Sequence, residues 1–156
     1  MELPQRKHPR LPTDNYSLPG SVCSVTFATK DRRPIFADHV VARAAIDILR
    51  DQSQATGVKV FGYCLMPDHV HLVISPSHSC DVMTFVGRVK NLMQREAWRH
   101  GVQGAIWQKS FWDHLLRADE QVEVVVGYVL RNPMRRGLVD DWHDYPFCGS
   151  FELDLD

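Results

Sequence analysis

The chain has 156 residues, of which 44% are hydrophobic and 24% are charged, as in an ordinary water-soluble globular protein. This length suits one domain with a substantial hydrophobic core. No apolar run approaches the about 18–20 residues of a membrane-spanning helix, and residues 1–18 lack the hydrophobic core of a signal peptide. The four cysteines form no C-x-x-C pair and fit no metal-binding spacing, so we expect free thiols and a cytoplasmic protein.

The net charge of −1 conceals an uneven distribution of charge along the chain. Residues 140–156 contain six acidic residues and no lysine or arginine, so residues 1–139 hold 18 basic and 13 acidic residues, a net charge of +5. We expect a single domain over residues 1–156, with an extended basic arm at residues 1–20 and an acidic tail at residues 140–156. A basic body is compatible with a polyanionic partner but does not demonstrate one.

The hydrophobic pattern, taken in chain order, predicts alternating strands and helices. Strands are expected at residues 21–30, 58–66 and 69–74 and within residues 106–117, and helices at residues 38–54, 81–100 and 120–131, the last capped by Asp119. The order strand-helix-strand-strand-helix-strand, followed by an extra helix, fits a ferredoxin-like α+β sandwich. Such a fold has a four-stranded antiparallel sheet with two helices on one face. Its other face is open to a site that the third helix can cover or flank.

Two histidines separated by one residue lie in an apolar strand that follows a Pro67-Asp68 turn. Alternate side chains of a strand point to the same face, so His69 and His71 project together. Two adjacent imidazoles can provide half of a divalent-metal site, although an isolated H-x-H is more often a polar strand face with satisfied histidines.

The third helix carries the other distinctive residues. Its valines recur at helical spacing and predict a buried stripe, whereas Tyr128 lies outside that stripe, with Asn132 one turn later on the same side. Taken alone, these two residues are more typical of a tyrosine packed at the helix edge and an asparagine that caps the helix before Pro133 than of a functional pair.

Together, these motifs resemble those of the single-tyrosine HUH transposases, and more narrowly the REP-associated tyrosine transposases. The resemblance rests on the H-V-H after Met66, and on residues 128–139, which read YVLRNPMRRGLV. It extends to the segments at residues 10–36, 107–114 (WQKSFWDH) and 145–150 (YPFCGS), in the family's order. Met134, Arg136 and the Cys148-Gly149 pair depart from the usual pattern, but they concern packing and the tail.

The resemblance implies the ferredoxin-like fold and a divalent metal, Mg²⁺ or Mn²⁺, with His69, His71 and Asn132 as its ligands. It implies that Tyr128 is the catalytic nucleophile. The expected activity is that of a metal-dependent single-stranded DNA endonuclease and strand transferase, which cleaves hairpin-forming repeat DNA through a 5′-phosphotyrosine. The expected protein is a monomer or homodimer, without membrane association, and associated with the nucleoid when DNA is bound.

Several basic residues are candidate DNA contacts, and Trp107, Trp112 and the basic arm are candidates to hold unpaired bases. The basic candidates are Arg88, Lys90, Arg95, Lys109, Arg117, Arg131, Arg135 and Arg136. Asp113 and His114 are interpreted as structural or supporting groups. Two alternatives stay open: a catalytically silent, domesticated protein that binds palindromic repeats, and a metallohydrolase of small phosphoesters in which Tyr128 is dispensable.

Overall fold

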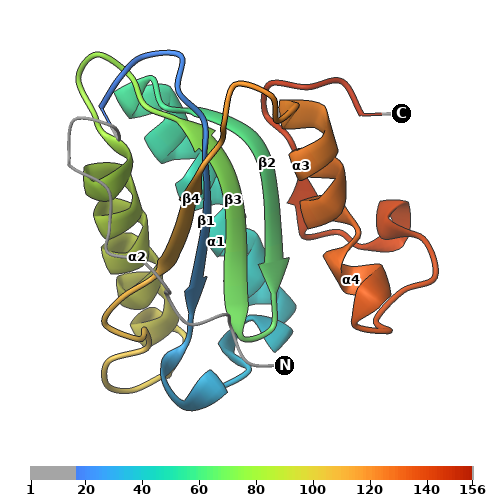
Figure 1. Ribbon diagram of the computed structural model, residues 1–156. Coiled ribbons are helices and arrows are strands. Elements are labelled where there is room, and N and C mark those ends of the chain that lie inside the picture. Colours follow the sequence, from blue (N-terminus) through green and yellow to red (C-terminus); the bar gives the residue numbers. More distant parts are fainter. Residues whose placement is uncertain (1–16, 156) are drawn as a thin grey trace.

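The computed structural model describes residues 17–155, and its centre is an antiparallel sheet of strand order β4-β1-β3-β2-β5 (Figure 1). The strands are β1 (Cys23–Ala28), β2 (Lys59–Met66), β3 (His69–Ser75), β4 (Trp112–Leu115) and β5 (Cys148–Gly149). The longer helices are α1 (His39–Thr56), α2 (Val82–Arg99) and α3 (Val122–Leu130), and α4 (Asn132–Arg135) is a single turn. Short 3-10 helices are η2 (Lys30–Arg32), η3 (Ile35–Ala37) and η4 (Trp142–Asp144). The predicted sandwich is confirmed.

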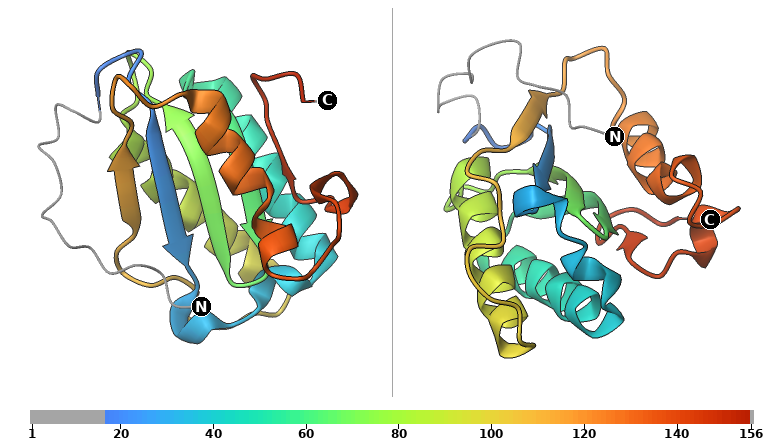
Figure 2. Two further views of the ribbon diagram at one scale, coloured as in Figure 1. Left: turned by 45° about the vertical axis from the view of Figure 1, so that its right-hand side comes forward. Right: turned by 90° about the horizontal axis from the view of Figure 1, so that it is seen from below.

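Helices α1 and α2 form one layer against one face of the sheet, as the view from below shows (Figure 2). Asp38 caps α1 by accepting a hydrogen bond from the Val40 N–H, and Gly57 ends it in the left-handed conformation at φ 78°. Asp81 caps α2 by accepting from the Thr84 N–H. The first and last residues of both helices therefore lie within two residues of the predicted positions.

In strands β1 and β3, near the centre of the sheet, alternate side chains face opposite sides, so core residues and site residues point in opposite directions. Val70, Leu72 and Ile74 of β3 are buried in the core against the two helices, which leaves the histidines between them on the opposite face. Strand β1 follows the same rule, with Val25 and Phe27 in the core. The predicted projection of His69 and His71 to one face of their strand is confirmed.

Helix α3 covers part of the open face of the sheet, where Val126, Val129 and Leu130 pack on a second apolar cluster that includes Cys64 and Val73. Its predicted start was wrong, because the helix begins at Val122 with Gln121 as its N-cap and no capping side-chain hydrogen bond. Asp119 makes no cap. The helix ends before Pro133 as predicted, and that proline lies in the first turn of α4.

The C-terminal segment adds a fifth strand that the sequence analysis did not predict. Strand β5 pairs with β2 through the registers Tyr63–Gly149 and Cys64–Cys148. Phe147 is buried in the main core, and the Tyr145 hydroxyl donates to the Leu65 carbonyl oxygen at 2.6 Å. The acidic tail is therefore part of the fold as far as residue 155.

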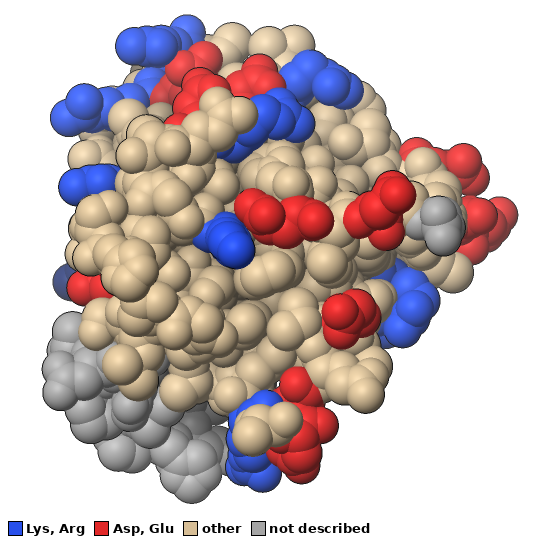
Figure 3. Space-filling model, turned by 90° about the horizontal axis from the view of Figure 1, so that it is seen from above, with Lys and Arg blue, Asp and Glu red and all other residues tan. Residues whose placement is uncertain are grey.

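The end of the molecule that is uppermost in Figure 1 carries charges of both signs. Acidic and basic side chains lie beside one another on the face in Figure 3, outside the grey area, and they form no continuous basic patch there. Residues 1–16, which include most of the predicted basic arm, lie outside the described residues. Within residues 17–155, no helix combines the length and apolar character needed to cross a membrane.

Candidate functional site

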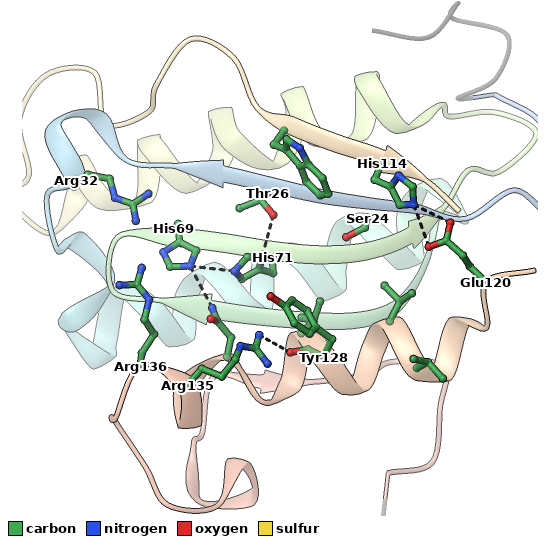
Figure 4. A pocket seen from close by; sticks show the side chains of 15 residues that line it. Ser24, Thr26, Arg32, His69, His71, His114, Glu120, Tyr128, Arg135 and Arg136 are labelled. Atoms are coloured by element: carbon green, nitrogen blue, oxygen red, sulfur yellow. Dashed lines mark hydrogen bonds and ion pairs between the residues drawn. The ribbon is translucent and has the colours of Figure 1, made fainter. Parts of the chain in front are cut away.

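A pocket of about 430 Å³ lies on the open face of the sheet, between strands β4, β1 and β3 and helix α3 (Figure 4). One end holds the histidines and the arginines. The other end holds apolar side chains and the hydrogen-bonded pair of His114 and Glu120. Its lining residues are Ser24, Thr26, Arg32, His69, His71, Trp112, His114, Glu120, Val124, Val125, Tyr128, Val129, Asn132, Arg135 and Arg136.

The two histidines of β3 converge at one end of this pocket. The Nε2 atoms of His69 and His71 lie 3.1 Å apart, and the rings are nearly perpendicular, at 88°. Only one proton can lie between two such nitrogens, so at least one ring presents a lone pair there. The predicted juxtaposition of the two imidazoles is present in the structure.

The other ring nitrogen of each histidine contacts a neighbouring residue. His69 Nδ1 lies 2.6 Å from a carboxylate oxygen of Asp68 and donates its proton to it. His71 Nδ1 lies 2.8 Å from Thr26 Oγ1, directly across the β1–β3 ladder. A histidine that donates from Nδ1 keeps its lone pair on Nε2, where a metal ion binds. These contacts therefore orient both rings toward a shared point.

Asn132 brings a third polar group to the same point. It is 2% exposed, and its Nδ2 donates to His69 Nε2 at 3.2 Å. A rotation of the amide by 180° would present Oδ1 there instead, because the oxygen and nitrogen occupy equivalent positions. Two imidazole nitrogens and an amide oxygen form a neutral donor set that suits Mn²⁺ and is compatible with Mg²⁺. The residues present therefore fit a divalent ion.

Both imidazoles are neutral at physiological pH. Burial, together with the charges of His69 and of nearby arginines, lowers the pKa of His71 to about 3. Burial also lowers the pKa of His69, although its bond with Asp68 acts in the opposite direction. Burial opposes the ionisation of Asp68, but the hydrogen bond from His69 and the charge of Arg32 hold its pKa below the ordinary value. The imidazoles are thus in the protonation state that coordination requires.

Tyr128 projects from α3 into the middle of the pocket, beside His71 (Figure 4). It is 61% exposed, which is unusual for a large side chain on a helix that packs on a sheet. The guanidinium of Arg135 lies over its ring at 3.8 Å and donates to its main-chain carbonyl oxygen at 2.7 Å. These two contacts fix the ring while leaving it accessible to a ligand.

Three arginines surround the histidine end of the pocket: Arg32, Arg135 and Arg136. Asp31 and Arg32 have φ angles of 56° and 55°, in a region that residues other than glycine rarely adopt. This turn places Arg32 Nε 3.1 Å from a carboxylate oxygen of Asp68. Arg136 Nε is buried, and within the described residues it has no hydrogen-bond partner. Clustered guanidinium groups of this kind suit an anionic ligand.

The structure brings only some of the predicted DNA contacts into the pocket. Arg135 and Arg136 line it, so the interpretation of Arg136 as a residue of packing or the tail was wrong. Arg88, Lys90 and Arg95 lie on α2, on the other side of the sheet. Three further candidates lie elsewhere: Lys109 precedes β4, Arg117 follows it, and Arg131 lines a separate hollow beside the C-terminal segment.

The two candidate tryptophans also separate. Trp112 lines the pocket, but Trp107 packs on the core at 5.0 Å from the Phe27 ring and 5.6 Å from the Phe36 ring. Its Nε1 donates to the Lys90 carbonyl oxygen. Trp107 is therefore a packing residue in this structure and no part of the pocket.

Several residues of the site were not predicted from the sequence: Thr26, Arg32 and Glu120, which line the pocket, and Asp68, which accepts from His69. A signal existed for Asp68, which directly precedes the first histidine, and for Thr26, which lies on the polar face of its strand. Nothing in the local sequence indicated Arg32, because its position depends on the turn that follows β1.

Comparisons with known proteins identify a family for this chain. The model of the family described as "Transposase IS200 like" matches residues 21–132. A Haemophilus influenzae protein assigned to the REP-associated tyrosine transposases is 28% identical over 103 residues, which cover 59% of this chain and 58% of that protein. The REP-associated tyrosine transposase of Escherichia coli is 25% identical over 116 residues, 74% of this chain and 66% of that protein. The matches thus span less than two thirds of both relatives.

The fold comparison finds a similar architecture in a solved structure. The solved structure of a REP-associated tyrosine transposase bound to a REP hairpin matches with a TM-score of 0.70, covering 92% of this chain and 82% of that chain. The sequence identity is 21%, so this likeness shows the fold. Because the family model spans most of the sequence, from β1 to Asn132, the chain belongs to the IS200-like transposase family.

Proposed function

We propose that this protein is a metal-dependent single-stranded DNA endonuclease and strand transferase that acts on hairpin-forming repeat DNA. The observation that carries the proposal is the position of Tyr128, which lies in one pocket with two converging imidazoles and a group of arginines. The names of the relatives, and the hairpin bound in the neighbouring structure, support a REP-type hairpin as the substrate.

The arginine end of the pocket would bind the scissile phosphodiester. Arg136 has a buried Nε without a partner among the described residues, and Arg32 and Arg135 lie at the same end. A phosphate there would accept hydrogen bonds from these guanidinium groups, which would offset its negative charge.

His69, His71 and Asn132 would hold the divalent ion, Mg²⁺ or Mn²⁺, at the point where their side chains converge. When bound, the ion would supply positive charge beside the phosphate, undiminished because all three ligands are neutral. The contacts of Asp68 and Thr26 with the outer ring nitrogens would keep both imidazoles in the required orientation.

Tyr128 would carry out the cleavage. Its hydroxyl oxygen loses its proton to solvent and bonds to the phosphorus, while the bond from phosphorus to the 3′-oxygen breaks. The 3′-oxygen leaves with the electron pair and takes up a proton, giving a free 3′-hydroxyl and a 5′-phosphotyrosine. Attack by another 3′-hydroxyl reverses these bonds and rejoins strands without an external energy source.

The test is to incubate the protein with end-labelled oligonucleotides of the palindromic repeats that flank its gene, with Mg²⁺ or Mn²⁺. Denaturing electrophoresis should reveal a covalent protein–DNA adduct. Tyr128→Phe should abolish the adduct, because it removes the attacking oxygen, and should preserve DNA binding. Tyr63→Phe is the matched control, because Tyr63 is buried in the core on the side of α1 and α2.

Two outcomes would contradict the proposal. A fully active Tyr128→Phe protein would exclude this residue as the nucleophile. Hairpin binding without an adduct in either metal would favour the silent, domesticated DNA-binding protein instead.

A further inference from the structure

The end of the pocket farther from the arginines has a different chemical character. Trp112 of β4, and Val124 and Val125, which precede Tyr128 by about one turn of α3, give the pocket apolar walls. The pair formed by His114 and Glu120 lies at its far end (Figure 4). His114 Nε2 lies 2.8 Å from Glu120 Oε1 and 3.1 Å from Oε2, and Oε1 also accepts from the Arg117 N–H. The proposed chemistry at Tyr128 uses none of these groups.

The pairing of residues between neighbouring strands fixes the distance of Trp112 from the histidines. Trp112 pairs with Thr26 across β4 and β1, and Thr26 pairs with His71 across β1 and β3. Because neighbouring strands lie about 4.8 Å apart, Trp112 and His71 are about 10 Å apart on the same face. His114, two residues later, continues the face, with its ring 6.2 Å from that of Trp112 and tilted by 21°.

This division of the pocket matches the two parts of a nucleotide. Cationic groups at one end suit a phosphate, whereas an aromatic plane with aliphatic walls suits the flat face of a base. The Glu120 carboxylate disfavours a second phosphate at the apolar end, because two negative charges would repel each other there. The volume of about 430 Å³ is in the range of small-ligand pockets.

We infer that the apolar end is a base-binding subsite, where one unpaired base next to the scissile phosphate stacks on Trp112 and contacts the His114–Glu120 pair. This inference rests on the proposed function, because the base belongs to the same DNA strand whose phosphate would react with Tyr128. A carboxylate oxygen only accepts hydrogen bonds, so Glu120 selects a base whose edge carries N–H groups. Guanine fits best, because its N1–H and N2–H₂ groups lie side by side and can both point to one carboxylate.

The first experiment measures stacking without chemistry. The Tyr128→Phe protein is titrated into single-stranded oligonucleotides that carry one 2-aminopurine, placed in turn at each position around the cleavage site. One position should show fluorescence quenching, and Trp112→Ala in the same background should remove it, because the stacking partner is lost. Trp98→Ala is the matched control, since Trp98 is 47% exposed and lies on α2 on the other side of the sheet.

The second experiment measures selection of the base edge. At the quenched position, guanine is replaced by inosine, which lacks the 2-amino group, and the rate of adduct formation is compared. The wild-type protein should prefer guanine by about 10-fold, the scale expected when part of a specific base contact is lost. Glu120→Gln should reduce that preference, because an amide presents only one acceptor oxygen.

Some results would contradict the base-binding subsite alone, and others would contradict the chemistry at Tyr128 alone. Quenching that survives Trp112→Ala, or a guanine preference that survives Glu120→Gln, would overturn the base-binding subsite even where the Tyr128 adduct forms normally. Conversely, Trp112-dependent quenching in a protein that forms no adduct would support the subsite and contradict the proposed chemistry.

Discussion

Thr26 is a small residue with a specific task, because its hydroxyl lies 2.8 Å from His71 Nδ1 and is the hydrogen-bond partner of that nitrogen. Thr26→Val keeps the shape of the side chain but removes this partner. The His71 ring can then adopt the tautomer that carries its proton on Nε2, which cannot bind a metal ion. We expect the affinity for Mn²⁺ to fall by about 10-fold, the lower end of the range for such supporting contacts. Isothermal titration calorimetry with Mn²⁺ measures this directly.

Thr26→Ser is the control for that experiment, because serine retains the hydroxyl. Its Mn²⁺ affinity should stay close to that of the wild-type protein. An unchanged affinity in Thr26→Val would show that the contact does not orient the ring for a metal.

Individual site residues were predictable from the sequence where a local pattern or family motif indicated them. The alternation of β3 was enough to place both histidines on one face, and the spacing on α3 placed Tyr128 and Asn132 together. Arg32 could not be found in this way, because its left-handed backbone and its contact with Asp68 arise from tertiary structure. The roles of all these residues in catalysis are still predictions.

Helix α3 depends on a close approach to β2, which Gly62 permits. A Cβ at Gly62 would lie 3.0 Å from a methyl carbon of Val126, which is 1% exposed and has no room to move away. Gly62→Ala should therefore push α3 outward and lower the free energy of unfolding by about 1–3 kcal/mol. Urea denaturation measures the loss, and adduct formation should slow because Tyr128 moves with the helix.

Gly87→Ala provides a contrast on another helix. Gly87 is exposed on α2, and a Cβ there would have no described atom within 4 Å. Because alanine is the better helix former, this variant should gain up to about 1 kcal/mol in the same denaturation experiment. Equal stability losses in the two variants would contradict the role given to Gly62.

At the scale of elements, long segments with a clear hydrophobic period were predicted and short ones were not. The periodic patterns of α1, α2 and the hairpin of β2 and β3 were sufficient to give both their type and their order. Strand β5 has two residues, too few to show an alternation, and it exists only because the tail meets the edge of β2. The start of α3 was misplaced because Glu120 accepts from the Arg117 N–H in a turn, so the helix starts after it.

The whole molecule depends on its C-terminal segment for stability. Phe147 fills the main core beside α1, with its ring 4.9 Å from that of His39, and Tyr145 bonds to the backbone of β2. Removal of residues 140–156 should therefore lower the free energy of unfolding by at least the about 3–5 kcal/mol expected for the loss of one buried phenylalanine. Thermal denaturation of the truncated chain tests this.

Charge and packing in that segment can be separated. Replacing Asp140 and Asp154 by asparagine removes two negative charges from side chains that are exposed, so the melting temperature should change little. A large drop in melting temperature for this variant, with none on truncation, would show that the charges of the segment, and not its packing, stabilise the fold.

Helix α3 packs on the same chain's β2 and β3, so one polypeptide contributes both Tyr128 and the two histidines to the pocket. A mixture of Tyr128→Phe protein with a His69→Ala/His71→Ala variant should consequently form no adduct, and the appearance of one would reveal exchange of α3 between subunits. With DNA held at a saturating concentration, the yield per protein molecule should also be unaffected by dilution of the protein. One protein molecule bound to one hairpin would then be sufficient for cleavage, without prior association of a second molecule.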